Sequence, residues 1–88
     1  MQQTLTISNQ LGLHARAAAK LVKCASSFQS RVLLTCKGRE VNAKSIMGVM
    51  MLAASQGTEL TVTADGIDAE QAIAAVRELV DDKFGEGQ

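Results

Sequence analysis

Apolar residues recur with two different periods along this chain, and that alternation constrains the fold more than any other feature. Near the N-terminus, Leu5 and Ile7 alternate with polar residues, which is the period of a half-buried strand. From about Ala15 to Phe28, apolar residues instead recur every three or four positions, as on a helix with one apolar face. The chain is therefore predicted to mix short strands with amphipathic helices.

Five further elements are predicted after the first helix. They are a strand over residues 31–37, a returning hairpin arm over 40–43, a short helix over 46–54, a strand over 59–64 and a final helix from Asp68 onward. The hairpin is expected at an edge of the sheet. Asp68 and Gln71 have the spacing of a capping box for the final helix, and residues 85–88 are expected to fray.

Each predicted strand has one apolar face, and each long helix has one apolar stripe. The economical arrangement of such elements is an antiparallel sheet with every helix on one side. We therefore predict an α+β fold, an open-faced two-layer sandwich of order β-α-β-β-α-β-α. A chain of 88 residues is expected to form a single domain over residues 1–88.

The composition argues against several classes of function. Nine basic and nine acidic residues cancel, whereas a nucleic-acid-binding domain needs a strongly positive surface. No apolar run reaches the length of a membrane span and no signal peptide is recognisable, so we expect a cytoplasmic protein. Cys24 and Cys36 lack the spacing of a metal or redox pair and are expected to be free thiols. Neither a cofactor nor a metal is predicted.

The only histidine, His14, is predicted to lie where a turn over residues 9–12 ends and the first helix begins. At a helix N-terminus, backbone N–H groups lack intrahelical partners and the dipole favours negative charge. Arg16, in the first turn, carries donors suited to phosphate oxygens. Together they suggest a nucleophilic imidazole that receives a phosphoryl group, and the helix N-terminus should favour its neutral form. The alternative is that His14 is an ordinary surface residue.

Two motifs, in this order and at this separation, resemble those of the histidine-containing phosphocarrier (HPr) family of the bacterial phosphoenolpyruvate-dependent phosphotransferase system. The first runs from Gly12 to Ala18 and reads GLHARAA, similar to the family's active-site pattern. The second runs from Lys44 to Met50 and reads KSIMGVM, similar to its regulatory-serine segment. The resemblance covers essentially the whole chain.

The resemblance implies that His14 accepts a phosphoryl group through Nδ1 from enzyme I, which is itself charged by phosphoenolpyruvate. His14 would then pass the group to an enzyme IIA protein in sugar uptake or a related regulatory relay. Arg16 would bind the phosphoryl oxygens, together with the backbone amides of Arg16 and Ala17. The family also implies the strand order 1-4-2-3. Such a protein is a carrier without turnover of its own, and we expect a monomer.

Ala17 departs from the family pattern, which usually has proline at this position. Alanine keeps an N–H group that proline lacks, and it gives a less rigid first turn. We therefore expect the site to be retained and the transfer kinetics to differ only modestly.

Ser45 resembles the residue that HPr kinase/phosphorylase modifies in many members of the family. A phosphate on Ser45 would lie at the N-terminus of the short helix and would add negative charge beside Met47. That charge would block docking of a partner without unfolding the protein. The alternative is that Ser45 serves only as the N-cap of this helix.

Four further residues are candidates for partner binding. The short helix is too apolar to bury every side, so Met47 and Met50 are expected to stay partly exposed and to suit adaptable contacts. Lys20 and Lys23, on the helix that follows His14, could form a basic margin for acidic partners. The alternatives are that the methionines fill gaps in the core and that the lysines are simply solvated.

Two other functions are weighed against the carrier. A regulatory protein-binding module, controlled by phosphorylation of Ser45, would use the same methionines with little transfer through His14. A small ligand-binding α/β domain would have a pocket and no phosphorylation. The presence of both His14 and Arg16 favours the carrier.

Overall fold

Strand pairing in the computed structural model, which describes residues 1–87, builds one four-stranded antiparallel sheet. The strands are β1 (Gln2–Thr6), β2 (Arg31–Cys36), β3 (Arg39–Asn42) and β4 (Glu59–Asp65), and their order is β1-β4-β2-β3. Leu5 pairs with Leu60 and Leu34 pairs with Val62, so apolar side chains from neighbouring strands share one face. The predicted strand order and the edge position of the hairpin arm are confirmed.

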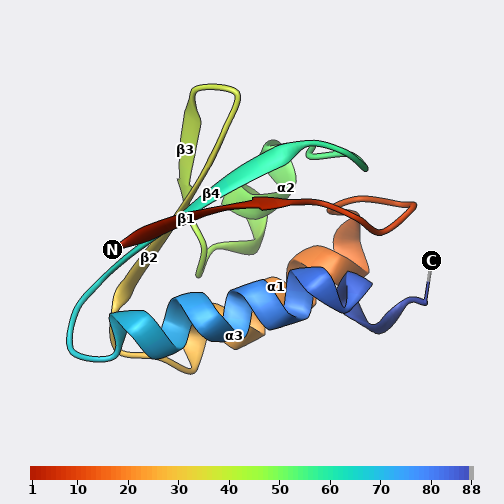
Figure 1. The fold of residues 1–88 in the computed structure, drawn as a ribbon. Helices are drawn as coiled ribbons and strands as arrows, with labels where there is room; N and C mark the ends of the chain where they lie inside the picture. The colour runs from red at the N-terminus through yellow and green to blue at the C-terminus, as the bar shows by residue number, and fades with distance from the viewer. Residues whose placement is uncertain (88) are drawn as a thin grey trace.

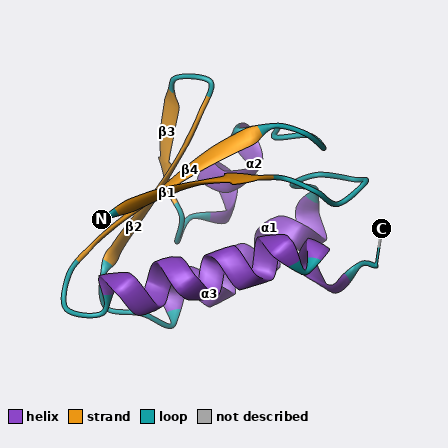
Figure 2. Ribbon diagram, in the orientation of Figure 1, coloured by secondary structure: helices purple, strands orange, loops and turns teal. Residues whose placement is uncertain are grey.

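The helices are α1 (Ala15–Ser26), α2 (Ile46–Met51), α3 (Ala69–Asp81) and a short 3₁₀ turn, η1 (Lys83–Gly85). Figure 1 shows α1 and α3 side by side beneath the sheet, and Figure 2 shows these two long helices as a layer separate from the strands, whereas the short α2 overlaps the strands in this view. The predicted open-faced α+β sandwich is therefore confirmed. The helix α2 is shorter than the predicted 46–54, because Ala53 adopts a left-handed conformation with φ of 49° that ends it.

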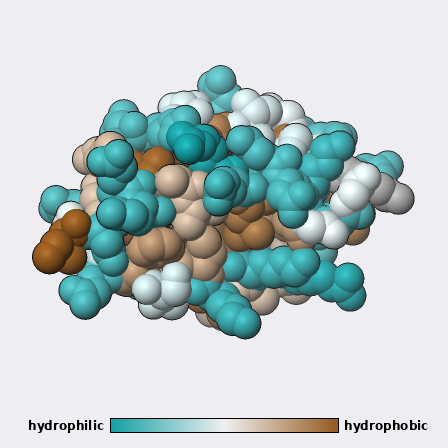
Figure 3. Space-filling model, turned by 60° about the horizontal axis from the view of Figure 1, so that its bottom comes forward, coloured by the Kyte–Doolittle hydropathy of each residue, from teal (hydrophilic) through white to brown (hydrophobic). Residues whose placement is uncertain are grey.

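The core lies between the sheet and the two long helices. Leu21 and Val76 from the helices, and Leu34 and Leu60 from the strands, are fully buried. Figure 3 turns the helical layer toward the reader and shows hydrophilic residues over much of this face, with hydrophobic residues between them. Among residues 1–87, no helix is both long and apolar enough to cross a membrane.

The predicted capping box at Asp68 is wrong. The Asp68 side chain makes no capping bond to α3 and instead accepts hydrogen bonds from the backbone N–H groups of Gln29 (2.9 Å) and Ser30 (2.8 Å) and from the Ser30 hydroxyl. These bonds, the Ser30 hydroxyl first, hold the pKa of Asp68 below its ordinary value. The loop after α1 presents three donors to the Asp68 carboxylate, and hydrogen bonds to these donors replace a capping bond to the amides of α3.

The expected fraying of the C-terminus is wrong for Gly85 and Glu86, whereas Gln88 lies outside the described residues. Lys83, Phe84 and Gly85 adopt left-handed conformations with φ of 55°, 55° and 76°, and they turn the chain back after α3. Phe84 is fully buried, and the Lys20 ammonium donates to its carbonyl oxygen at 2.6 Å. This turn brings Glu86 to the start of α1.

Candidate functional site

His14 is positioned by a loop that fits closely against the segment before β4. Gly12 has φ of 68°, and a Cβ added there would lie 2.5 Å from the carbonyl oxygen of Ala54. The next residue, Leu13, donates its N–H to that same oxygen at 2.8 Å. Only glycine allows this approach, so the Gly12-Leu13 pair fixes where the helix α1 begins.

His14 is the N-cap residue of α1, as predicted. Its backbone is extended (φ −76°, ψ 177°), and its carbonyl oxygen accepts the first intrahelical bond from Ala18 at 2.8 Å. The His14 side chain does not cap the helix, which leaves the imidazole free for other contacts. Ala15 and Arg16 are exposed, whereas Ala17 is fully buried. The backbone amide of Ala17 is therefore buried together with the rest of this residue.

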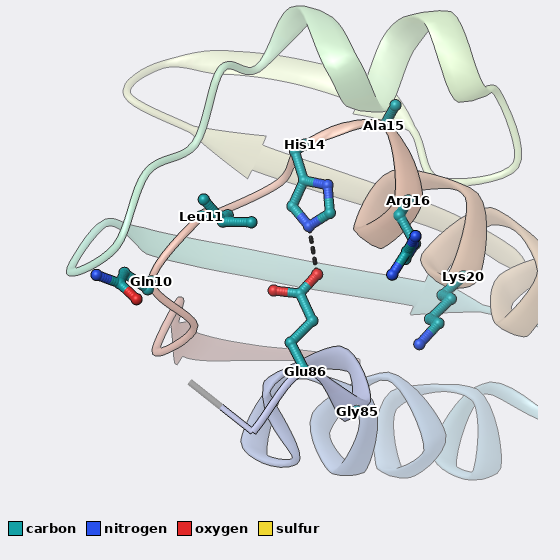
Figure 4. Close-up of a pocket in the computed structure, with 8 residues that line it drawn as sticks. All are labelled: Gln10, Leu11, His14, Ala15, Arg16, Lys20, Gly85 and Glu86. Atoms are coloured by element: carbon teal, nitrogen blue, oxygen red, sulfur yellow. Dashed lines mark hydrogen bonds and ion pairs between the residues drawn. The ribbon is translucent and has the colours of Figure 1, made fainter.

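Glu86 contacts the imidazole directly. Its Oε2 atom pairs with Nε2 of His14, and its Oε1 atom accepts a hydrogen bond of 2.9 Å from the side-chain amide of Asn9 (Figure 4). The side chain of His14 is 30% exposed and that of Glu86 only 14% exposed. Hydrogen bonds from Asn9 and His14 hold the pKa of Glu86 below its ordinary value, so this carboxyl is ionised at neutral pH.

Asn9 is fully buried and acts as the support for this pair. Its Nδ2 group donates both to Glu86 and, at 2.8 Å, to the carbonyl oxygen of Gly12. Two acceptors on one side fix the orientation of the amide, because the opposite orientation would place its oxygen against both. The Asn9 Oδ1 atom is left without a hydrogen-bond partner among the described residues. Asn9 therefore links the loop before α1 to the C-terminal turn.

His14 and Glu86 line a depression with a volume of about 660 Å³. Arg16 and Lys20 contribute two cationic side chains to its wall, and His14 and Glu86 contribute the imidazole and the carboxylate (Figure 4). The arrangement provides a half-exposed nucleophile, cationic groups and helix amides at one place. Those are the parts that transfer of a phosphoryl group requires.

The other predicted site residues lie outside this depression. Ser45 is the N-cap of α2, and its hydroxyl oxygen accepts a hydrogen bond of 3.2 Å from the Gly48 N–H. Met47 is 72% exposed and Met50 is 44% exposed, so neither fills a gap in the core. Lys23 is exposed in the last turn of α1, and of the four predicted partner residues only Lys20 lines the depression.

Sequence reasoning missed Glu86 and Asn9. Glu86 lies between two glycines in a stretch without periodicity, so the sequence carries no signal for its contact across 72 residues with His14. Asn9 was visible only as one polar residue of a turn. The turn at Lys83 and Phe84 brings Glu86 close to Asn9 and His14. Both turn residues adopt a left-handed conformation that lysine and phenylalanine ordinarily avoid, so the sequence does not predict this turn.

The two cysteines and the acidic residues add no second site. Cys36 is buried, and partial burial raises the pKa of the Cys24 thiol, so neither thiol has the character of a nucleophile. Within residues 1–87, no three histidine, cysteine or acidic side chains lie close enough together to hold a metal ion.

Comparison with known proteins assigns the family. The model of the family described as PTS HPr component phosphorylation site matches residues 1–82. The chain is 58% identical over 86 residues to the phosphocarrier protein HPr of Xylella fastidiosa, covering 98% of this chain and 97% of the relative. It is 51% identical over 88 residues to that of Cupriavidus necator, covering 100% and 99%.

The fold agrees with this assignment. A crystal structure of HPr from Thermoanaerobacter tengcongensis superposes with a TM-score of 0.94 at 46% identity, and it covers 98% of this chain and 97% of that one. The family resemblance of the two sequence motifs is thereby confirmed. The chain belongs to the HPr family, the phosphocarrier proteins of the phosphotransferase system.

Proposed function

We propose that His14 accepts a phosphoryl group from phosphorylated enzyme I, and ultimately from phosphoenolpyruvate, and passes it to an enzyme IIA partner in sugar uptake or a related regulatory relay. The chain acts as one domain over residues 1–88, as a cytoplasmic monomer, and has no turnover of its own. The observation that carries this proposal is the half-exposed imidazole of His14 at the N-cap of α1, beside Arg16 in one depression.

The charges around the imidazole support this role. A phosphoryl group on His14 would bring negative charge to the positive end of α1, which has no acidic residue in its first turn. The guanidinium of Arg16 is suited to the phosphoryl oxygens, and the backbone amides of Arg16 and Ala17 are the further donors that we propose.

Intact-protein mass spectrometry after incubation with phosphoenolpyruvate and enzyme I tests the proposal. The parent should gain one acid-labile phosphoryl group, and the His14→Ala variant should gain none. An enzyme I preparation that is active on another carrier but leaves the parent unmodified would contradict the proposal. Addition of an enzyme IIA protein should then remove the label from the parent.

Ser45 is proposed as a regulatory site for HPr kinase/phosphorylase. Its hydroxyl caps α2, and the exposed Met47 lies two residues further along. A phosphate of about −1.5 to −2 charges would be stabilised by the helix amides and would oppose apolar docking at Met47. Labelling by the kinase should disappear in Ser45→Ala, and undiminished labelling would place the modification elsewhere.

The proposed partner surface consists of Lys20, Lys23, Met47 and Met50, which are all exposed. The same methionines favour a second candidate function, a regulatory binding module that is controlled through Ser45 and transfers little through His14. The mass measurement separates the two functions, because only the carrier gains a phosphoryl group from phosphoenolpyruvate.

A further inference from the structure

The C-terminal turn holds one carboxylate against His14 by several independent contacts. Burial of Phe84 and the bond from Lys20 to its carbonyl oxygen anchor the turn, and Asn9 holds Oε1 of Glu86. Lys83 and Phe84 are held in left-handed conformations, with φ of 55° each, which are unfavourable for residues other than glycine. These contacts together fix the position of the C-terminal turn and hold the Glu86 carboxylate beside the His14 imidazole.

The contact selects one nitrogen of the imidazole. A carboxylate only accepts hydrogen bonds, so its pairing with Nε2 requires the proton to lie on Nε2. In the neutral ring the other nitrogen, Nδ1, then carries the free lone pair. Figure 4 shows Nε2 directed at Glu86 and the other ring nitrogen turned to the side of Arg16 and the start of α1.

We propose that Glu86 is a positioning residue for His14, which keeps the proton on Nε2 and so leaves Nδ1 as the nucleophile. This inference rests on the proposed role of His14 as the phosphoryl acceptor. Glu86 itself touches neither the phosphoryl group nor the donor. Its effect passes through the imidazole, as the aspartate orients histidine in a serine-protease triad.

The transfer step gives Glu86 a second effect. The Nδ1 lone pair forms a bond to phosphorus while the bond from phosphorus to the donor breaks, and the electron pair of that bond leaves with the donor. No proton leaves the ring, so the phosphorylated imidazole keeps its Nε2 proton and gains a positive charge. The carboxylate of Glu86 faces that charge and stabilises it more than it stabilises the neutral ring.

Two variants separate these effects. Glu86→Ala removes both the acceptor and the charge, whereas Glu86→Gln keeps an acceptor oxygen and loses the charge. Glu78→Ala, on the exposed side of α3, is the matched control. The first readout is the ¹⁵N NMR spectrum of the His14 ring at a pH where the imidazole is neutral, and the second is the initial rate of phosphorylation by enzyme I.

In the parent and in Glu78→Ala, the spectrum should show a protonated Nε2 and an unprotonated Nδ1. In Glu86→Ala, the two signals should move toward those of a histidine in a short peptide, and the rate should fall about ten- to one-hundred-fold, the range for loss of a hydrogen bond to a charged group. Glu86→Gln should keep more of the parent's ring signals than Glu86→Ala but should also transfer more slowly than the parent.

The inference would be overturned if Glu86→Ala gave the same ring signals or the same phosphorylation rate as Glu78→Ala. Glu86 would then only stabilise the turn that follows α3. The NMR readout does not depend on transfer. A parent that shows the Nε2–H ring but gains no phosphoryl group would therefore refute the proposed function separately.

Discussion

The residue with the least freedom near the site is Gly12, because both its conformation and its surroundings exclude a side chain. Alanine there would adopt a left-handed φ of 68° and would bring its Cβ within 2.5 Å of the Ala54 carbonyl oxygen. We expect Gly12→Ala to lower the free energy of unfolding by about 2–3 kcal/mol, measured by urea denaturation.

Gly57→Ala is the control for this effect, because Gly57 has φ of 88° but nothing within 4 Å of an added Cβ. It should lose only about 1 kcal/mol, the cost of the left-handed conformation alone. Equal losses in the two variants would show that the close approach to Ala54 contributes nothing.

Ala17 should tolerate the proline that is usual in the family. Proline is accepted in the first turn of a helix because the N–H that it lacks has no intrahelical partner there. Of the two backbone amides proposed as donors to a phosphoryl group on His14, this replacement removes that of Ala17 and keeps that of Arg16, so at most one hydrogen bond is lost. We expect the phosphorylation rate of Ala17→Pro to lie within about ten-fold of the parent's. A gain of several hundred-fold would show that rigidity of the first turn controls transfer.

At the scale of elements, the bond from Asp68 to the loop after α1 should make stability depend on pH. The pKa of Asp68 is lower in the folded protein than its ordinary value of 3.8. The contribution of Asp68 to the stability of the fold is therefore complete above pH 3.8. The contribution is lost as the pH falls through the lower folded-state pKa. Asp68→Asn should therefore unfold at lower urea than the parent at pH 7, and the difference should narrow below about pH 4.

Asp81→Asn, at the exposed end of α3, removes the same charge without touching this loop. The difference in stability between Asp81→Asn and the parent, measured by unfolding in urea, should vary less with pH over the same range. The same narrowing in both variants would show that net charge, and not the bonds from Ser30 and Gln29, produces the effect.

The same bonds mark the limit of prediction from sequence for the elements. Periodicity predicted every strand and long helix, because burial of one face dominates their energetics. Periodicity could not show that the Asp68 side chain would accept hydrogen bonds from Ser30, 38 residues away, and not from the amides of α3. For the site, the Gly12 to Arg16 motif is local and therefore visible. Glu86 reaches His14 only through a tertiary turn of residues that rarely adopt its conformation.

At the scale of the whole molecule, the site joins both ends of the chain. The depression is lined by Gln10 and Leu11 from the loop before α1 and by Gly85 and Glu86 from the turn after α3, and Asn9 joins these two segments through its hydrogen bond to Glu86. The exposed methionines of α2 are not part of that depression. We therefore expect that a change at the exposed methionines of α2 will affect the proposed docking of a partner and leave the proposed chemistry at His14 unchanged.

Met47→Asp tests this separation. Loss of a methionine buried by a partner removes about 1.5–3 kcal/mol of apolar contact, so the half-saturating concentration for phosphorylation by enzyme I should rise about ten-fold or more. Stability should change by less than about 0.5 kcal/mol, because Met47 is 72% exposed and aspartate is favoured near a helix N-terminus. The maximal rate should be nearly unchanged.

Ile67→Asp is the control, because Ile67 is an exposed apolar side chain at 88% and lies in the turn between β4 and α3. That turn is at the opposite end of the molecule from the start of α1 (Figure 1). Its replacement should change the half-saturating concentration less than two-fold, about the limit for a residue outside the interface. Equal effects of the two variants would mean that exposed apolar area anywhere on the surface suffices, whereas an effect of Met47→Asp alone would assign docking to α2.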